Sequence, residues 1–506
     1  MKRLNRISLL AAMVAALGAC SLEETPYGFY SDSNFPSTEA DAEAAALYIY
    51  DAINYIEYSR SIVFLGDMNT DELEPKGDAA QSTQDLDAWR LNNFKNNTAL
   101  GNYFKYSYIT INRANAVIKN VTGMNIDESF RSRYVGEAYF MRGYSYFNLA
   151  RNFGRVPIHT SVVETLEDTQ ASLPATLDEM WARVIEDFET ACSHLSYYGT
   201  PETGRADLAA AQSMLAKTYL HLASAKANGV PQYADMTFDV DEYYGKAAEY
   251  AAKVVLNAEQ TTYGFSDNLE DIFDVEKPTG PEHIFIMSMD RTGASEGQYS
   301  KISKMYLPYI AGGTVYLMEN DGSLIPTHDG WGEYRTTDAF YKSFESGDRR
   351  HDELIVSEVY DKDGNSIASV SDGKLPYPFC RKYIDPSFVG DKTSTRPYLI
   401  RFSDVALVYA EAAGPVADAY TLVNFIRRRA GLGDLAPGLS TEAFRQAVLQ
   451  ERIYELAFEG NICYDLRRWN LLHKNVSAAV SQGLTAEDMV FYPIPSIETD
   501  LNPNIN

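Results

Sequence analysis

Three carboxylates recur every four residues near the end of the chain, at Glu451, Glu455 and Glu459. Residues four apart lie on one face of a helix, so this spacing brings the three side chains together. A glycoside hydrolase needs two carboxyl groups roughly 5–9.5 Å apart, which makes hydrolysis of a sugar one interpretation. However, Arg452 is adjacent and further arginines lie nearby at 427–429 and 467–468. We therefore favour a structural ion-pair network in which guanidinium groups satisfy the carboxylates, and keep the hydrolase as the alternative.

A second polar cluster, Asp361, Asp363 and Asn365, has the spacing that begins a calcium-binding loop. Ser366 stands where an EF-hand requires glycine, and no helical pattern flanks the segment. A glycine-containing hairpin turn within residues 359–367 explains the same residues.

Motifs of other chemistries are missing from the sequence. The seven histidines are scattered without an HExxH pair, and no CxxC occurs, so a zinc site is not supported. Phosphate-binding and dinucleotide-binding glycine patterns and the GxSxG nucleophile motif are also missing. The sequence predicts a protein without catalytic residues, cofactor or metal.

Two tryptophans lie in loop-like stretches and are candidates for stacking against a ligand. Trp89 is followed by Asn92 and Asn93, whose amides can bond to sugar hydroxyl groups. The other candidate is Trp331, which lies between two glycines and precedes Tyr334 and Arg335. Flat aromatic faces ringed by polar groups suit sugar recognition. For each tryptophan the alternative is an anchor that packs a loop against the core, as we expect for Trp181 and Trp469 in helical patterns.

The amino terminus has the pattern of a lipoprotein signal peptide. Three cations at positions 2, 3 and 6 precede an uncharged apolar run from Ile7 to Leu17. This run is too short to span a bilayer, which takes roughly 20 residues, but it suits a signal-peptide core. Small residues lead to Cys20, whose thiol can accept a lipid. We predict a signal peptide at 1–19 and a lipidated tether at 20–37.

The net charge of −26 limits the partners of the chain. An acidic body repels phosphate backbones, so we expect no nucleic-acid partner. It also repels anionic lipid, so attachment to a membrane would rest on the acyl chains at Cys20. Three cysteines remain besides Cys20, far apart and odd in number, and do not indicate a disulfide framework.

The elements that would position these residues are mostly helical. In Asp207–Ala223 the residues Leu208, Leu215 and Tyr219 lie on one helical face. Helical patterns dominate 38–260, interrupted near 67–100, and return in 400–506, whose tail from Phe491 is too broken for a helix. Residues 261–399 carry Gly and Pro clusters and short strand-like runs. We predict a mainly α fold, with a TPR-like helix-pair scaffold in 38–260 and 400–506 and a loop-rich insertion with short β-hairpins in 261–399.

Seven segments in order resemble the SusD/RagB-like family of outer-membrane nutrient-binding lipoproteins. They begin at Tyr103-x4-Tyr108-Ile109-x2-Asn112-Arg113-Ala114-Asn115, Gly136-Glu137-Ala138, Ala216-Lys217-x-Tyr219, Arg401-Phe402-Ser403-Asp404, Asn424-x-Ile426-Arg427, Glu451-Arg452-x2-Glu455 and Tyr492-Pro493-Ile494-Pro495. Each is short, but their order spans nearly the whole mature chain.

The resemblance implies TPR-like helix pairs carrying a loop-rich insertion. It also implies a lipid-anchored protein on the outer face of the outer membrane that binds a nutrient, most often an oligosaccharide. Such proteins deliver the nutrient to a TonB-dependent, SusC-like transporter. The acidic Ser21–Glu24 segment resembles a surface-export signal. A surface glycoside hydrolase and a scaffold of the uptake complex that binds no sugar remain as alternatives.

Overall fold

The computed structural model describes residues 37–198, 204–257, 260–310 and 314–505. The predicted signal peptide, Cys20 and nearly all of the predicted tether lie outside these ranges. Helices dominate the described chain, and strands form only small sheets. No helix in these ranges has the length and apolar character needed to cross a bilayer.

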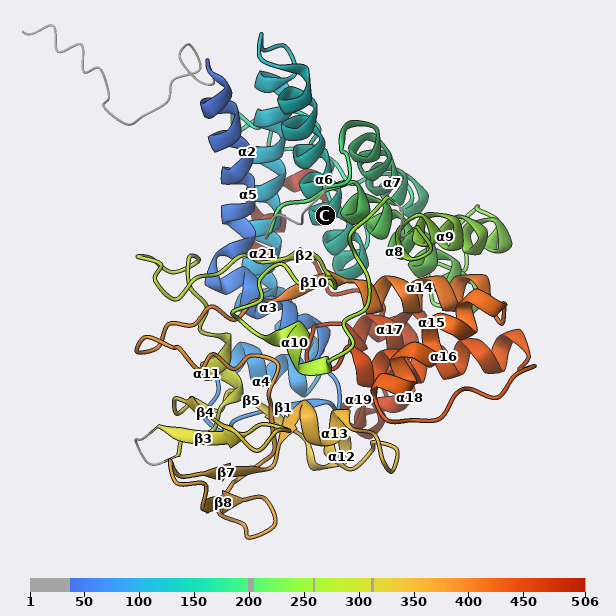
Figure 1. Ribbon diagram of the computed structural model, residues 1–506. Coiled ribbons are helices and arrows are strands. Elements are labelled where there is room, and N and C mark those ends of the chain that lie inside the picture. The colour runs from blue at the N-terminus through green and yellow to red at the C-terminus, as the bar shows by residue number, and fades with distance from the viewer. Residues whose placement is uncertain (1–36, 199–203, 258–259, 311–313, 506) are drawn as a thin grey trace, which may run out of the picture.

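The first helical region is a series of neighbouring antiparallel helices (Figure 1). Its helices are α2 (Glu39–Asn54), α3 (Ile56–Gly66), α5 (Thr98–Val121), α6 (Glu128–Phe153), α7 (Leu177–His194), α8 (Leu208–Ala227) and α9 (Val240–Val255). Consecutive long helices pack in pairs, as in α5 with α6 and α8 with α9. Asp207 caps the predicted helix at Leu208 by accepting a hydrogen bond from the Ala210 N–H. All alanines of α8 except Ala227 at its end are buried, and their small side chains let neighbouring helices approach closely.

The second helical region extends the first. It comprises α14 (Phe402–Ala413), α15 (Ala417–Arg429), α16 (Thr441–Glu455), α17 (Ile462–Arg468), α18 (Leu472–Asn475), α19 (Ser477–Gln482) and α20 (Ala486–Met489). Helix α14 packs against α9, α15 and α16, so one apolar core runs through both regions. Helices from distant parts of the chain therefore form one scaffold.

Short helices and strands lie between the two helical regions in sequence. They are α10 (Leu269–Phe273), β2 (His283–Ile286), α11 (Ile302–Tyr306), β3 (Val315–Met318), β4 (Leu324–Thr327), β5 (Tyr334–Thr336), α12 (Asp338–Tyr341), α13 (Arg350–Glu353), β6 (Ile355–Val356), β7 (Glu358–Tyr360), β8 (Ser366–Ser369), β9 (Phe379–Cys380) and β10 (Tyr398–Arg401). The sheet β4-β3-β7-β8 lies at the bottom of Figure 1 over its own small apolar cluster. The predicted hairpin is confirmed as β7–β8, which pair antiparallel.

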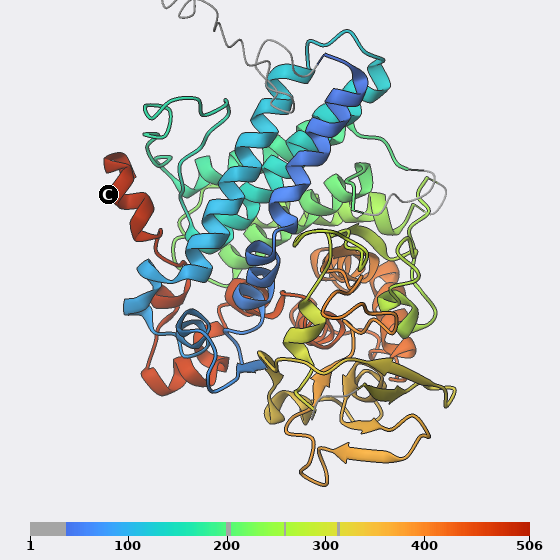
Figure 2. The same ribbon diagram turned by 90° about the vertical axis from the view of Figure 1, so that its left-hand side faces the viewer.

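Two segments predicted as irregular contain helices. The stretch near 67–100 holds β1 (Leu73–Pro75), α4 (Gln81–Asp87) and the 3-10 helix η1 (Leu91–Asn96), and β1 pairs with β5. The tail holds α21 (Ser496–Leu501) and η2 (Pro503–Ile505), which lie beside α5 at the left of Figure 2. The Asn502 amide holds the tail by donating to the carbonyl oxygens of Thr169 and Ala171. Tertiary contacts therefore stabilise a helix that the local sequence did not predict.

Candidate functional site

The Trp331 loop joins β4 to β5 and is held through its backbone. The Trp331 N–H donates to the Lys304 carbonyl oxygen at 2.7 Å. The neighbouring Gly330 and Gly332 N–H groups donate to the carbonyl oxygens of Pro308 and Leu307, each at 2.9 Å. Three backbone hydrogen bonds from consecutive residues thus fix the loop against residues 304–308. The Trp331 indole takes no part in these bonds.

The two glycines make this close approach possible. A Cβ atom at Gly330 would lie 1.8 Å from the Leu307 carbonyl oxygen. Gly332 has a φ of 61° and lies under the Tyr377 hydroxyl, which would be 2.3 Å from a Cβ atom there. A residue with a side chain would push the loop away from its support at either position.

Trp331 and Tyr309 form the aromatic part of the candidate site. Trp331 is 39% exposed and Tyr309 is 71% exposed. The hydrogen bond between Gly330 and Pro308 brings the backbones next to these two residues side by side. Large aromatic side chains are rarely left this open, and their flat faces can stack on the apolar face of a pyranose ring. Tyr309 could not be predicted from the sequence, because only the backbone contact brings it beside Trp331.

Charged groups surround this aromatic pair. The Lys304 Nζ lies 3.3 Å from Asp329 and 2.9 Å from Asp391, whose side chain is 53% exposed. On the other side of Trp331 in sequence, Glu333 pairs with Lys76 at 3.0 Å. The hydrogen bond to Lys304 lowers the pKa of Asp391 and keeps it ionised at neutral pH. These carboxylates can accept hydrogen bonds from sugar hydroxyl groups.

Tyr334 and Arg335 were predicted to contact the ligand, but in the structure Tyr334 is buried and Arg335 is hydrogen-bonded to the Trp331 loop. Tyr334 is fully buried, with its ring edge against Phe64 and Tyr306 at centroid distances of 5.4 and 5.1 Å. Its position inside β5 directs the ring into the core, so it offers no open face. Arg335 is half-buried, its guanidinium 5.1 Å from the Tyr377 ring centroid and its Nε donating to the Gly332 carbonyl oxygen. Arg335 therefore supports the loop from beneath.

Trp89 also differs from its expected role as an open platform. It is 1% exposed, lies at a φ of 47° after α4, and stacks on Tyr492 with the ring centroids 5.7 Å apart. Its Nε1–H donates to the Asn69 carbonyl oxygen at 2.8 Å. The alternative interpretation, an anchor that packs the loop, describes this position.

Asn92 and Asn93 are exposed on η1. Helix η1 packs on α4, α5 and α21, whereas the Trp331 loop is held by the end of α11 and by Tyr377. The structure does not show Asn92 and Asn93 as part of the Trp331 surface.

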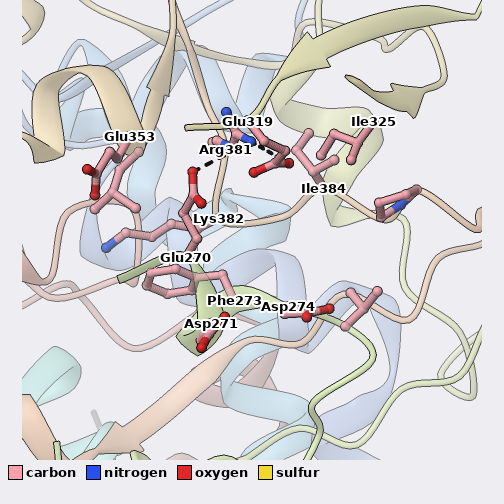
Figure 3. Close-up of a pocket in the computed structure, with 13 residues that line it drawn as sticks. Glu270, Asp271, Phe273, Asp274, Glu319, Ile325, Glu353, Arg381, Lys382 and Ile384 are labelled. Carbon is pink, nitrogen blue, oxygen red and sulfur yellow. Dashed lines mark ion pairs between the residues drawn. The ribbon is translucent and has the colours of Figure 1, made fainter. Parts of the chain in front are cut away.

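A separate acidic cleft of about 230 Å³ lies between α10, the β3–β4 hairpin, the end of α13 and residues 381–386 (Figure 3). Its Arg381 Nη2 lies 2.6 Å from Glu319 and 3.7 Å from Glu270. Burial raises the pKa of Glu270 to about 7; Arg381 opposes the rise and the nearby Glu319 adds to it. The two carboxyl groups share one guanidinium and lie within hydrogen-bonding reach of each other, closer than the spacing at which glycosidase carboxyl groups work.

The Glu451, Glu455 and Glu459 series is buried inside the scaffold. Glu455 pairs with Arg401 at 2.8 Å and with Arg429 at 2.7 Å. Glu451 pairs with Arg350 at 2.6 Å, and Glu459 pairs with Lys382 and Arg401. Neighbouring arginines keep the pKa of Glu455 well below its usual value despite burial. The favoured interpretation, an ion-pair network, matches this geometry.

The predicted calcium-like residues form a turn. Asp361 Oδ1 accepts hydrogen bonds from the backbone N–H groups of Asp363 and Asn365, both at 2.9 Å. Within the described ranges, no group of three or more His, Cys, Asp or Glu side chains could hold a metal ion. The hairpin interpretation accounts for these residues.

The scaffold itself carries a groove of about 630 Å³ between α2, α5 and the tail. Figure 2 shows α21 running beside α5 on this side of the molecule. The groove is lined by aromatic, aliphatic and polar residues, among them Tyr48, Tyr108, Asn112, Leu166 and Glu498. Its volume lies within the usual range for small-ligand pockets, roughly 300–1,000 Å³. An extended ligand would also fit here.

Comparisons with known proteins agree with this architecture. The family described as "SusD family" matches residues 281–506, and the one described as "Starch-binding associating with outer membrane" matches residues 31–220. SusD-like protein P2 of Formosa agariphila is 24% identical over 493 residues, which cover 92% of this chain and 90% of that protein.

Solved structures share the fold at low sequence identity. A SusD homologue from Bacteroides thetaiotaomicron superposes with a TM-score of 0.75 at 21% identity and covers 94% of this chain and 98% of its own. A laminarin-binding SusD-like protein gives 0.73 at 21% identity, with 92% and 98% covered. Surface glycan-binding protein A from Bacteroides uniformis gives 0.70 at 21% identity, with 93% and 99% covered. The predicted fold class, mainly α with TPR-like helix pairs and short β-hairpins, is confirmed.

Proposed function

The chain belongs to the SusD/RagB-like family, and we propose that it binds a carbohydrate on the outer face of the outer membrane for uptake into the cell. The names of two structural neighbours, one laminarin-binding and one glycan-binding, support a carbohydrate as the ligand. The description of the family that matches residues 31–220 supports the outer membrane as the location.

The observation that carries this proposal is the exposed aromatic pair on a fixed loop. Trp331 and Tyr309 are open to solvent, while the N–H groups of residues 330–332 are hydrogen-bonded to residues 304–308. A rigid aromatic platform loses little entropy when a ligand binds. Asp329, Glu333 and Asp391 supply acceptors around it. We propose that residues 261–399 contain the ligand-binding surface and that the two helical regions form the scaffold that supports it.

We further propose a lipid anchor and a transporter partner for this protein. Lipid on Cys20 would hold the protein to the membrane, and residues 20–37 would act as a tether. The bound sugar would pass to a TonB-dependent, SusC-like transporter. Deletion of the transporter should abolish uptake while leaving surface binding of the sugar intact. Loss of surface binding in that strain would contradict a separate binding role.

Isothermal titration against an oligosaccharide panel tests the binding site. We expect Trp331→Ala to weaken binding of the recognised sugar by tenfold or more, because stacked rings contribute strongly to such contacts. Tyr48→Ala in the scaffold groove is the matched control and should keep wild-type affinity. Loss of affinity in Tyr48→Ala alone would place the ligand in the groove. A complete lack of sugar binding in the wild type would support the scaffold alternative.

The hydrolase alternative is best tested at the acidic cleft, although the close spacing of Glu270 and Glu319 does not fit a glycosidase. Glu270 has a pKa near 7 and could donate a proton at neutral pH. A turnover assay on the same panel decides this. Product release that disappears in Glu270→Gln would establish a hydrolase. Unchanged substrate after long incubation is the result that we expect.

A further inference from the structure

Basic side chains from three parts of the chain gather where α6 and α8 pack against the second helical region. They are Arg151 on α6, Lys217 on α8, Arg452 on α16, and Arg467 and Arg468 on α17. All except Lys217 have pKa values raised above the usual one, so they are cations at any physiological pH.

Three carboxylates pair with three of these cations. Asp404 pairs with Lys217 and, at 2.9 Å, with Arg452. Asp465 pairs with Arg452 and Arg468, both at 2.9 Å. Glu411 accepts from Arg468 at 2.7 Å. These pairs use all three carboxylates, so none of the three is left to pair with Arg151 or Arg467.

Arg151 and Arg467 carry the surplus positive charge. The Arg151 guanidinium lies 3.5 Å from the Tyr464 ring centroid and forms no ion pair or side-chain hydrogen bond within the described ranges. Arg467 is 4% exposed and donates from Nη1 to the Arg151 carbonyl oxygen, while its Nε and Nη2 have no described partner. Aromatic faces compensate a cation in part. Half-buried Arg151 and buried Arg467, neither paired with a carboxylate, still leave this part of the interior net positive, which is unfavourable without a counter-charge.

A crevice of about 30 Å³ opens at the same place. Four cations line it, Arg151, Lys217, Arg452 and Arg468, together with His221 and one carboxylate, Asp465, which is already paired with Arg452 and Arg468. Burial and then the nearby arginines hold the pKa of His221 well below its usual value, which is the response of an imidazole to a positive environment. The crevice volume is space open to the centres of water-sized particles, so the crevice can hold one small particle.

We propose that this crevice binds one small monovalent anion of the halide type, with chloride as the natural occupant. The anion would neutralise part of the surplus charge of Arg151 and its neighbours. It would thereby link α6 and α8 of the first helical region to α16 and α17 of the second. This site is independent of the carbohydrate surface at Trp331.

Thermal unfolding of the full mature chain in different sodium salts tests the proposal. At equal ionic strength, chloride should raise the melting temperature by about 2 °C over gluconate, which is too large for the crevice. Arg151→Met should lose this difference between the salts. Arg428→Met is the matched control, because Arg428 is an exposed arginine paired with Asp434, and it should keep the difference. Equal melting temperatures of the wild type in both salts would overturn the proposal.

Bromide provides a second readout that does not depend on a variant folding. Crystals of the wild type soaked in sodium bromide should show an anomalous peak among Arg151, Lys217, Arg452 and Arg468. Peaks confined to the protein surface would contradict the site.

Discussion

Trp89 and Trp331 both lie in short connections next to polar residues, yet they occupy opposite environments. Trp89 is 1% exposed and is covered by Tyr492 from the far end of the chain. Trp331 is 39% exposed and is held only through its backbone and two flanking glycines. The difference shows that an indole stays open when the backbone supplies the anchoring and no distant segment covers the ring.

The two tryptophans also differ in whether the side chain serves folding or ligand binding. At Trp89 the side chain provides the packing and a hydrogen bond to Asn69, so the fold depends on it. At Trp331 the loop would keep its three backbone hydrogen bonds without the indole. Substitutions at the two positions should therefore affect different properties.

The largest effect is expected from Trp89→Ala. Removing a buried indole should lower the free energy of unfolding by about 3–5 kcal/mol. Trp331→Ala is the matched control and should change it by no more than about 0.5 kcal/mol. Chemical denaturation of both variants measures the difference. A similar loss of unfolding free energy in the two variants would show that the Trp331 indole contributes to folding as much as that of Trp89.

A smaller loss is expected from Gly330→Ala. The new methyl group would clash with the Leu307 carbonyl oxygen, and overpacking of this kind costs about 1–3 kcal/mol. Because the loop must move, sugar affinity should fall as well. Gly77→Ala, where nothing lies near the added atom, is the control. Wild-type stability and affinity in Gly330→Ala would show that the glycine does not position Trp331.

The contact between Trp89 and Tyr492 should show a measurable coupling. A double-mutant cycle with Trp89→Leu and Tyr492→Leu should give about 0.5–1.5 kcal/mol for the stacked pair. The same cycle on Trp331 and Tyr309 should give a coupling near zero, since both rings face solvent. A large coupling there would mean that the two rings pack on each other and offer no open platform.

Acid should weaken the Trp331 loop slightly. The hydrogen bond to Lys304 holds the pKa of Asp391 below its usual value of 3.8 in the folded protein. The pair therefore stabilises the loop above about pH 4, and this contribution is lost as the pH falls through the lowered folded value. Sugar titrations between pH 7 and pH 4 should show almost constant affinity in wild type. Asp391→Asn should remove any further decline below pH 4, and a decline that persists would assign it to another group.

Local patterns in the sequence were sufficient to predict the helical regions and the β7–β8 hairpin. They could not predict the burial of Trp89, because its cover, Tyr492, comes from the tail. The α21 helix depends in the same way on contacts with residues 169–171. In the candidate site, Trp331 was proposed from its position between two glycines in a loop-like stretch. Tyr309 and Lys304 were not, because only the folded loop brings them beside Trp331.

A crystal structure of the protein with its recognised oligosaccharide tests the central claim most directly. We expect a pyranose ring against the face of Trp331, with hydroxyl groups within hydrogen-bonding distance of Asp329, Glu333 or Asp391. A sugar bound in the groove beside Tyr48 or in the acidic cleft at Arg381, with Trp331 bare, would contradict the account.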